Sequence, residues 1–427
     1  MPEPRDTAFE MATSNIRFGS GVTAEIGMDL ADLDAKRVLV FTDPRLARLP
    51  VMDTVLQSLR QEGIGFDVFD AVRVEPTDTS MLQAAEAATS APYDAYVAVG
   101  GGSVIDTAKV ANLLATYPAD LMDYVNAPLG KAKPVPGPLK PLIAVPTTAG
   151  TGSETTGVAI FDLTSMHAKT GIAHRRLKPT LGLVDPENTR SLPPLVAAST
   201  GLDVLCHALE SYTALPFDQR PRPARPLLRP AYQGANPISD IWSLRALELT
   251  GKYLPRVYAD SSDDEARSNM LLAATMAGMG FGNAGVHLCH GMSYPVSGMV
   301  RNYQPAGYPT DHPLVPHGIS VVLQAPAVFR FTAPACPQRH LRAAQALGFD
   351  VSADDLPNIG DRLAEGLVTL MRNLGLPSGL AAIGFTADDI PQLVAGTLPQ
   401  HRVTKLSPRP ASEDDLRQLF ADSMQLW

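Results

Sequence analysis

A chain of 427 residues is too long for one ordinary hydrophobic core and predicts two domains. Its 45% hydrophobic and 19% charged residues are typical of a soluble globular protein, and it has no apolar run long enough to span a bilayer. The net charge of −9 disfavours non-specific nucleic-acid binding, and it means that an anionic substrate needs a local basic patch. We therefore expect neither a nucleic-acid partner nor a membrane partner.

The first ten residues do not have the composition of a targeting segment. They include acidic residues and lack an apolar core, which fits neither a secretory signal nor an Arg-rich transit peptide, so a cytoplasmic protein is expected. The three cysteines do not make a disulfide framework. Cys206 and Cys289 each precede a histidine and lie about 100° around a helix from it, which favours small buried hydrophobes over thiolate ligands.

Residues 17 to 185 alternate short β-branched runs with helical stretches, which predicts a parallel sheet covered by helices. The candidate strands are 37–42, 66–69, 95–99 and 142–145. Ligands of such sheets collect at the carboxyl ends of the strands. The residues that follow each strand are therefore the candidates for a binding site.

A glycine triplet and a serine follow the third candidate strand, namely Gly100, Gly101, Gly102 and Ser103. The next residues read as a helix, so bare backbone N–H groups at its start can face a phosphate. This is the outline of a pyrophosphate cradle, although it is not the G-x-G-x-x-G fingerprint. A glycine triplet after a strand is also common as a simple turn.

Two further strand ends carry polar side chains. The fourth candidate strand leads into 146–154, a loop rich in small hydroxyl groups that can approach a nucleotide closely or can simply cap its own backbone. The first candidate strand is followed by Asp43. An acid here can accept hydrogen bonds from both ribose hydroxyls and repel a 2′-phosphate, which favours NAD over NADP, although Asp-Pro is also a common turn.

The chain changes character near residue 190. We predict an α/β domain at 1–190 and a mostly helical domain at 191–427. Amphipathic helices are expected at 239–257 and 264–279, and glycines after the second of these would let another backbone or a ligand come close.

A Pro- and Arg-rich insertion interrupts the helical half at 215–236. It contains too much proline for a helix or an inner strand. It is either a solvated surface loop or a lid that brings cations to an acidic substrate, and its arginines are Arg220, Arg222, Arg225 and Arg229.

One helical stretch, 201–212, carries a pair of candidate metal ligands. Asp203 and His207 stand four residues apart, so both side chains project from one face. Such a pair can bind one divalent cation. Alternatively, Asp203 interacts favourably with the helix dipole near the N terminus and His207 is an ordinary core histidine. His290 in a second expected helix and His317 at the start of a third would complete an Asp/His/His/His set.

Taken in series, these motifs resemble the iron-containing (group III) alcohol dehydrogenases, and the likeness covers nearly the whole chain. The matching segments are the glycine triplet with Ser103, Asp106 and Lys109, the loop 146–154, the Asp203/His207 pair, His290 and Pro316-His317-Gly318. The resemblance implies an N-terminal Rossmann-like α/β domain that binds the dinucleotide and an all-α C-terminal domain that holds a divalent metal. This is the fold shared with dehydroquinate synthase.

The resemblance also implies roles for particular residues. The metal ligands are expected to be Asp203, His207, His290 and His317, with iron as the metal and zinc as the runner-up. The expected NAD contacts are Asp43, the glycine triplet with Ser103 and Asp106, the threonines Thr147, Thr148 and Thr151, and Lys169.

Finer features resemble a branch of the family that passes hydride between hydroxyacids and oxoacids, and they include 206–212, 229–242, 285–295 and 396–400. The implied small-molecule partners are 4-hydroxybutyrate, giving succinate semialdehyde, and 2-oxoglutarate, giving 2-hydroxyglutarate, with one bound NAD carrying the hydride. A homodimer is the family expectation. Mitochondrial members carry a presequence that does not match this N terminus, so a bacterial cytoplasmic protein is expected.

One position departs from the wider family. Four residues after His290, where typical members have a second histidine that assists proton movement, this chain has Tyr294. Tyr294 and nearby His287 are the candidate catalytic residues in its place. By charge, Arg301 and the insertion arginines are the candidates for binding the substrate carboxylate.

Three alternative functions remain open at the level of sequence. The first is an ordinary NAD-dependent alcohol dehydrogenase with an exchangeable cofactor. The second is a dehydroquinate-synthase-like lyase, which has no net redox change. The third is a non-catalytic scaffold that kept the fold, although the intact ligand set argues against it.

Overall fold

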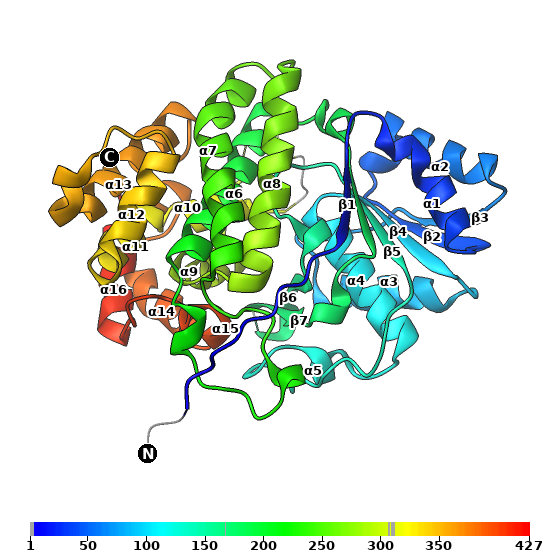
Figure 1. The fold of residues 1–427 in the computed structure, drawn as a ribbon, viewed down its shortest axis with the longest axis horizontal. Coiled ribbons are helices and arrows are strands. Elements are labelled where there is room, and N and C mark those ends of the chain that lie inside the picture. Colours follow the sequence, from blue (N-terminus) through cyan, green and yellow to red (C-terminus); the bar gives the residue numbers. More distant parts are fainter. Residues whose placement is uncertain (1–3, 167, 306–307, 309–311) are drawn as a thin grey trace. The chain divides into compact units, whose positions relative to one another are not determined.

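The computed structural model describes residues 4–166, 168–305, 308 and 312–427. The chain forms two compact units, an α/β unit of Ala12–Ser191 and a helical unit that combines the residues up to Met11 with Leu192–Trp427 (Figure 1). The segment before Ala12 therefore differs from the expected range 1–190, because it belongs with the helical unit. Within the described ranges, no helix is long and apolar enough to cross a membrane.

The α/β unit is built on a six-stranded sheet of order β1-β8-β5-β4-β2-β3, in which every neighbouring pair is parallel. Its strands are β1 (Asn15–Phe18), β2 (Arg37–Phe41), β3 (Gly65–Phe69), β4 (Ala95–Gly100), β5 (Leu142–Pro146) and β8 (Leu181–Val184). An antiparallel hairpin stands apart from this sheet, formed by β6 (Val158–Leu163) and β7 (Ala168–Ala173). The four strands predicted from β-branched runs are confirmed as β2 to β5.

Helices cover the sheet on both faces. They are α1 (Ile26–Asp32), α2 (Pro50–Gln61), α3 (Asp78–Thr89) and α4 (Gly102–Thr116), and a short α5 (Leu121–Tyr124) follows. On one face Val97 packs in a core with Ile26 and Leu59 of α1 and α2, and on the other Tyr96 packs with Ile105 of α4. Because both faces are covered, β4 is buried at every position and reads as an unbroken hydrophobic run.

The strand order reverses between the neighbouring strands β2 and β4, so the loops that follow these two strands diverge. The chain leaves β2 toward β3 and leaves β4 toward β5, on opposite sides. Open parallel sheets bind their ligands at such a point, outside the carboxyl ends of the strands. The loops that begin at Asp43 and at Gly101 both start there.

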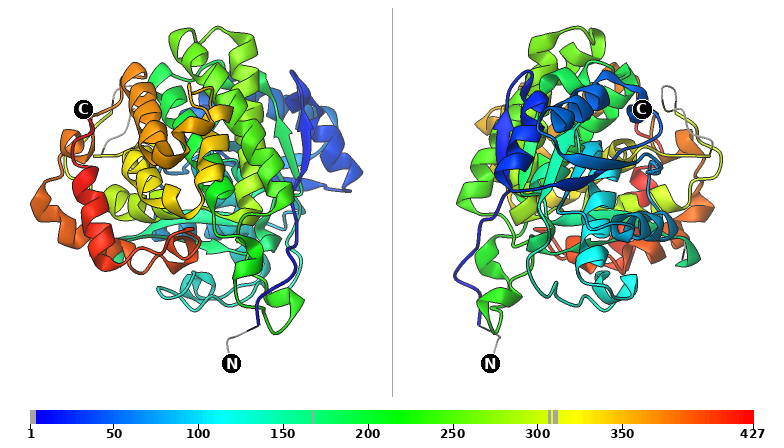
Figure 2. Two further views of the ribbon diagram at one scale, coloured as in Figure 1. Left: turned by 60° about the vertical axis from the view of Figure 1, so that its left-hand side comes forward. Right: turned by 90° about the vertical axis from the view of Figure 1, so that its right-hand side faces the viewer.

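Three long helices form the centre of the helical unit: α6 (Pro194–Thr213), α7 (Pro237–Ala259) and α8 (Asp264–Ala284). They run side by side in Figures 1 and 2. A Cβ on Gly280 of α8 would lie only 2.7 Å from Ser243 Oγ of α7, so the glycine permits the close helix contact that its sequence context predicted. The helix continues through these glycines to Ala284, beyond the predicted end at residue 279.

Shorter helices complete this unit. They are α9 (Leu288–Gly298), α10 (His317–Val322), α11 (Ala325–Thr332), α12 (Pro337–Ala346), α13 (Ile359–Asn373), α14 (Ile390–Thr397), α15 (His401–Thr404) and α16 (Glu413–Asp422). The helix α9 packs against α10, α14 and α15, so it lies at the centre of this group.

A buried ion pair joins the N-terminal segment to the Pro/Arg-rich insertion. Asp6 is 1% exposed and accepts hydrogen bonds from Arg220 Nη2 at 2.9 Å and from Arg229 Nε at 3.0 Å. The bond from Arg229 lowers the pKa of Asp6 although burial opposes the shift. Arg220 and Arg229 are therefore committed within the fold, which corrects the interpretation of these two arginines as solvated groups or as cations for a substrate.

Candidate metal centre and cofactor cradle

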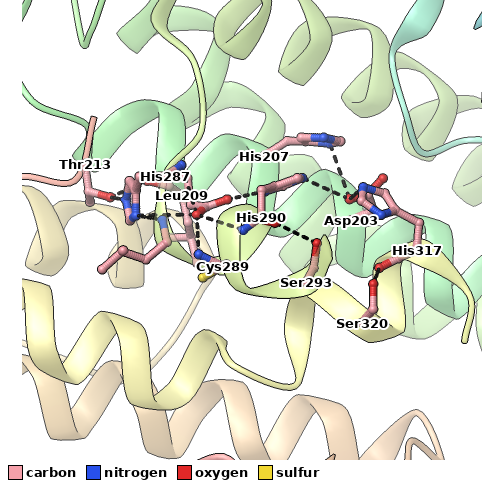
Figure 3. A network of polar contacts seen from close by, with 12 residues as sticks. Asp203, His207, Leu209, Thr213, His287, Cys289, His290, Ser293, His317 and Ser320 are labelled. Atoms are coloured by element: carbon pink, nitrogen blue, oxygen red, sulfur yellow. Dashed lines mark hydrogen bonds and ion pairs between the residues drawn. The ribbon is translucent and has the colours of Figure 1, made fainter. Parts of the chain in front are cut away.

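The four predicted metal ligands lie on three helices of the helical unit (Figure 3). Asp203 and His207 are on α6, His290 is on α9, and His317 is the first residue of α10. Ligand atoms of Asp203, His207 and His290 all lie within 4.8 Å of one another. The Nε2 of His317 is 3.8 Å from Asp203 Oδ1. The structure thus brings together all four residues that the sequence pattern singled out.

Local sequence explains how these helices approach each other. The four-residue spacing on α6 places His207 Nδ1 3.7 Å from Asp203 Oδ1. At the start of α10, a Cβ on Gly318 would lie 1.9 Å from the backbone oxygen of Ser199 and 3.1 Å from Asp203 Cβ. A glycine after His317 is therefore required for α10 to begin against α6.

Ring packing fixes the orientation of the imidazoles. The ring of His207 stacks on Phe281 of α8, with centroids 3.9 Å apart and planes 6° apart. It also stacks with His290 at 4.5 Å, and the rings of His290 and His317 meet edge to face at 5.5 Å. Ring packing of this kind restricts the rotamers of the imidazoles and so directs their ligand atoms toward the cluster.

The cluster places one carboxylate among three imidazoles in a buried environment. Burial alone would raise the pKa of Asp203, but the imidazoles hold it well below its usual range. Burial lowers the pKa of His207 to about 3. Burial also works against a charged His290, but Glu210 and Asp203 outweigh it and raise its pKa to about 10. The buried carboxylates of Asp203 and Glu210 therefore favour a positive charge at this site.

Three atoms at the centre of the cluster lack hydrogen-bond partners within the described part of the chain: Asp203 Oδ1, His207 Nδ1 and His290 Nε2. All three are buried. An unsatisfied buried polar atom costs about 1–3 kcal/mol, so a convergent group of them is rare unless a ligand completes it. A divalent cation accepts both imidazole nitrogen and carboxylate oxygen. The donor set therefore fits a metal ion.

Glu210 supports this cluster from the far side of His290, and the sequence reading gave it no role. Its carboxylate pairs with His290 Nδ1. It also accepts backbone N–H bonds from His287 at 3.1 Å and Cys289 at 2.7 Å, at the start of α9. Burial would raise the pKa of Glu210, but His290 and His287 lower it to about 2. An ionised carboxylate here orients the ring and leaves Nε2 directed at the cluster.

A sequence signal for Glu210 was present. It lies three residues after His207 and seven after Asp203, so all three share one face of α6. The sequence did not show that Glu210 contacts the start of α9, because this contact forms only in the tertiary structure.

The glycine triplet in the α/β unit forms the turn between β4 and α4, as predicted. A Cβ on Gly100 would lie 2.4 Å from Val104 Cγ2, and one on Gly102 would lie 2.6 Å from Thr151 Cγ2. A Cβ on Gly101 would lie 3.1 Å from Thr148 Oγ1. No side chain among the described residues caps the start of α4. This N terminus therefore fits an anionic group such as a pyrophosphate.

The neighbouring loops are tied to this turn. Thr42 Oγ1 donates to the backbone oxygen of Val99 at 3.0 Å, and the N–H of Thr147 donates to Gly100 O at 3.2 Å. Asp43 Oδ1 accepts the N–H groups of the next turn, from Arg45 and Leu46, both at 2.9 Å. The loops after β2, β4 and β5 thus lie side by side at the switch point.

Lys169 and Asp106 have structural partners in this unit. Lys169 Nζ lies 2.5 Å from Glu75 Oε2 and 3.1 Å from Asp162 Oδ1, and these acids raise its pKa against the effect of burial. The N–H of Glu75 in turn donates to Ser103 Oγ at 3.3 Å. Asp106 accepts from Ser153 Oγ at 2.5 Å, which holds the threonine-rich loop to α4. Both residues therefore support the walls of the cradle.

Comparison with known proteins decides the family. The family model for iron-containing alcohol dehydrogenase matches residues 13–186, and the model for the C-terminal part of the Fe-containing alcohol dehydrogenase family matches residues 231–424. The chain belongs to the iron-containing alcohol dehydrogenase family. Membership implies a nicotinamide cofactor and a divalent metal, and it makes the protein an oxidoreductase.

Curated relatives match this chain over nearly its whole length. The mitochondrial hydroxyacid-oxoacid transhydrogenase of Bos taurus is 59% identical over 99% of this chain and 91% of the relative. That of Homo sapiens is 58% identical over the same shares. The probable transhydrogenase of Dictyostelium discoideum is 54% identical over 99% of this chain and 80% of the relative.

Solved structures confirm the fold of the family. A 1,3-propanediol oxidoreductase is 26% identical and superposes with a TM-score of 0.85, covering 97% of this chain and 100% of its own. The sulfoacetaldehyde reductase of Bifidobacterium kashiwanohense, solved with NAD⁺, is also 26% identical and has a TM-score of 0.79, covering 97% and 98%. The α/β domain followed by an all-α domain, expected from the sequence, is therefore correct.

The expectation of a bacterial cytoplasmic protein is wrong. The relatives from Bos taurus, Rattus norvegicus and Homo sapiens are all named mitochondrial. That expectation rested on the acidic composition of the first ten residues. The structure shows why this composition is a poor guide to localisation. Asp6 forms ion pairs within the folded helical unit, so its acidic side chain is explained by the fold.

The two catalytic candidates, His287 and Tyr294, have different hydrogen-bond partners. His287 is fully buried, its Nε2 is 3.1 Å from Thr213 Oγ1, and its Nδ1 accepts the N–H of Leu288 at 2.8 Å. Burial lowers the pKa of His287 to about 4. Since both ring nitrogens are engaged, this arrangement favours support of α9 over proton transfer. The Tyr294 hydroxyl instead accepts a hydrogen bond from Arg402 at 2.8 Å.

Arg301, a candidate for binding the substrate carboxylate, is also committed within the fold. Its guanidinium pairs with Asp389, which in turn accepts the N–H of Thr386 at 2.8 Å. The pKa of Asp389 is lowered, first by the bond from Arg301. This pair accounts for Arg301, and it corrects the assignment made from charge alone.

Proposed function

We propose that this protein is a hydroxyacid-oxoacid transhydrogenase that moves hydride from 4-hydroxybutyrate to 2-oxoglutarate through one retained NAD. The observation that carries the proposal is 59% identity to a named transhydrogenase over 99% of the chain. The products are succinate semialdehyde and 2-hydroxyglutarate, so one hydride and one proton leave the donor and reach the acceptor. No net oxidant is consumed.

In this proposal Asp203, His207, His290 and His317 hold the divalent metal. When bound, the metal supplies Lewis-acid polarisation of the substrate oxygen and NAD supplies hydride acceptance. The Glu210 carboxylate keeps the Nδ1 side of His290 occupied and so fixes which nitrogen faces the cluster. Iron is the proposed metal and zinc the runner-up, because three imidazoles and one carboxylate suit either ion.

The cofactor would bind in the α/β unit. Gly100, Gly101 and Gly102 would let the pyrophosphate approach the start of α4, and Thr147, Thr148 and Thr151 would line the neighbouring loop. Asp43 would accept the ribose hydroxyls of NAD. Ser103, Asp106 and Lys169 would hold these loops in position through the contacts described above.

A cofactor-free assay tests the proposal. Purified protein is incubated with 4-hydroxybutyrate and 2-oxoglutarate without added NAD, and both products are measured. We expect succinate semialdehyde and 2-hydroxyglutarate in equal amounts. Turnover that begins only on addition of free NAD would instead show an ordinary dehydrogenase with an exchangeable cofactor. Formation of 2-hydroxyglutarate also excludes a lyase without net redox change.

Two further properties belong to this proposal. The metal is identified by elemental analysis of active protein, for which we expect iron near one equivalent per chain. The oligomeric state is proposed to be a homodimer, as is expected of the family, and light scattering of the metal-loaded protein measures it directly.

A further inference from the structure

Arg402, on the short helix α15, carries a buried polar atom without a partner. Its Nη2 donates to the Tyr294 hydroxyl at 2.8 Å, and its guanidinium lies over the ring of Tyr232, 4.9 Å from the centroid. Its Nη1 is buried and has no hydrogen-bond partner in the described part of the chain. One side of the guanidinium is therefore held in place while the other side presents an unused donor.

Among the described residues, the contacts of Arg402 are with tyrosines and include no carboxylate. A guanidinium stays protonated in proteins, so burial without an anion is costly. Other arginines of this unit meet carboxylates: Arg220 and Arg229 meet Asp6, Arg301 meets Asp389, and Arg339 meets Asp240. Arg402 instead contacts the phenols of Tyr294 and Tyr232. A cation in this setting fits an anionic ligand.

Two routes through side chains connect Arg402 with the candidate metal centre. Tyr294 follows His290 by four residues on α9, so both side chains lie on one face of that helix. On the second route, Tyr232 meets Phe281 edge to face at 6.4 Å, and Phe281 stacks on His207 at 3.9 Å. One residue, Tyr294, therefore separates Arg402 from His290, and two, Tyr232 and Phe281, separate it from His207, all within the same unit.

The two proposed substrates share one fragment that such a cation can hold. In 4-hydroxybutyrate the reacting carbon is separated from a carboxylate by two methylene groups. In 2-oxoglutarate the reacting carbon is separated from its distal carboxylate by the same two groups. One fixed cation near the metal can therefore position both substrates alike.

We propose that Arg402 Nη1 and the Tyr294 hydroxyl together bind the carboxylate of this shared fragment. The phenol accepts from Arg402 through its oxygen, which leaves its own proton for donation to the substrate. The guanidinium adds a charge-assisted bond, the stronger class of hydrogen bond. Arg402 is thus a specificity-determining residue, and this inference rests on the proposed function.

The test compares a charged and an uncharged substrate of the same length. The variants R402Q and Y294F are assayed with 4-hydroxybutyrate and with 1-butanol, with NAD added. For R402Q we expect kcat/KM for 4-hydroxybutyrate to fall about 10- to 100-fold, mainly through KM, while that for 1-butanol stays within about twofold. For Y294F we expect a smaller fall in kcat/KM for 4-hydroxybutyrate, of about 5-fold, again mainly through KM.

A binding measurement avoids dependence on turnover. Succinate has two carboxylates separated by two methylene groups and has no hydride to give. Its dissociation constant, measured by calorimetry, is expected to rise in R402Q by about the same factor as KM. Guanidinium ions added to R402A should restore part of the 4-hydroxybutyrate activity. R301Q is the matched control, because that arginine pairs with Asp389, and its substrate preference should equal that of the wild type.

The outcomes separate this inference from the function on which it rests. If the wild type oxidises 1-butanol but not 4-hydroxybutyrate, the proposed function is wrong. If the wild type prefers the hydroxyacid and R402Q keeps that preference, only the role of Arg402 is overturned. An equal loss for both substrates in R402Q, with unchanged succinate binding, would likewise assign Arg402 a structural role and overturn the inference.

Discussion

Glu210 pairs with Nδ1 of His290, while the opposite nitrogen of the same ring, Nε2, lies 3.5 Å from Asp203 Oδ1. The imidazole of His290 therefore lies between two buried carboxylates. Asp203, on the Nε2 side, is a candidate metal ligand, whereas Glu210, on the Nδ1 side, is separated from the candidate metal site by the ring. The same Glu210 accepts backbone N–H bonds at the start of α9. It couples the position of the helix to the orientation of the ligand.

Replacing Glu210 by glutamine should weaken metal binding without removing any ligand. The amide cannot accept all the bonds that the carboxylate accepts, and it no longer fixes the proton on Nδ1. We expect metal affinity to fall about 10- to 100-fold, as measured by competition with a chelator. Glu248→Gln on the exposed face of α7 is the control and should bind metal as the wild type does. Unchanged affinity in Glu210→Gln would refute the coupling.

Replacing Gly102 by alanine should disturb the cofactor cradle. Alanine normally favours a helix over glycine, but here the new Cβ would lie 2.6 Å from Thr151 Cγ2. Overpacking of this kind costs about 1–3 kcal/mol. We expect a lower melting temperature and an NADH dissociation constant raised about tenfold in fluorescence titration.

Gly65→Ala provides the contrast for that experiment, since a Cβ there would meet Lys36 O at an ordinary 3.5 Å. It should leave NADH affinity unchanged. Equal effects of the two substitutions would show that loss of glycine, and not the cradle, is responsible.

Replacing Asp43 by asparagine separates its charge from its role in the turn. The amide oxygen can still accept from the N–H groups of Arg45 and Leu46, which the carboxylate accepts at 2.9 Å. The turn should persist, but the repulsion of a 2′-phosphate should be lost. We expect the preference for NADH over NADPH, measured as a ratio of dissociation constants, to fall roughly tenfold. Asp70→Asn, on an exposed residue after β3, should keep the ratio.

Replacing Asp6 by asparagine should destabilise the helical unit in a pH-dependent way. The variant removes the carboxylate that Arg220 and Arg229 share, which costs about 2–4 kcal/mol at neutral pH. The pKa of Asp6 is lowered in the folded state, chiefly by the bond from Arg229. Its stabilisation is therefore fully present above the ordinary value of 3.8 and is lost as the pH falls below it.

Urea unfolding at pH 7 and near pH 3 measures this difference. The gap between wild type and Asp6→Asn should shrink at the lower pH. Asp218→Asn, an exposed acid in the same insertion, should remain within about 0.5 kcal/mol of the wild type at both values. A gap that does not depend on pH would show that the ion pair does not carry the effect.

Much of the α/β unit could be predicted from sequence because its strands are buried on both faces. Runs such as 95–99 are hydrophobic throughout, and glycine or hydroxyl residues follow them. The strands β1 and β8 have only four residues each, too few to show a period, and they were missed. The hairpin of β6 and β7 was also missed, since its pairing is not a local property.

The site divides in the same way. Asp203 and His207 could be paired from spacing on one helix, and His317 from its position before a glycine. Glu210 and Arg402 acquire their importance from partners that only the tertiary structure supplies, namely the start of α9 and the Tyr294 hydroxyl. Charge alone suggested Arg301 instead, because a sequence does not show that Asp389 neutralises it.

The ion pair of Asp6 has a consequence for how the protein matures. The residues before Ala12 are synthesised before the α/β unit, whereas their partners on the insertion are synthesised after it. Asp6 and Arg220 are 214 residues apart, so their ion pair forms only after the α/β unit has been synthesised. Proteolytic clipping ahead of Ala12 should accordingly loosen the later-made helical unit and spare the α/β unit that adjoins it in sequence.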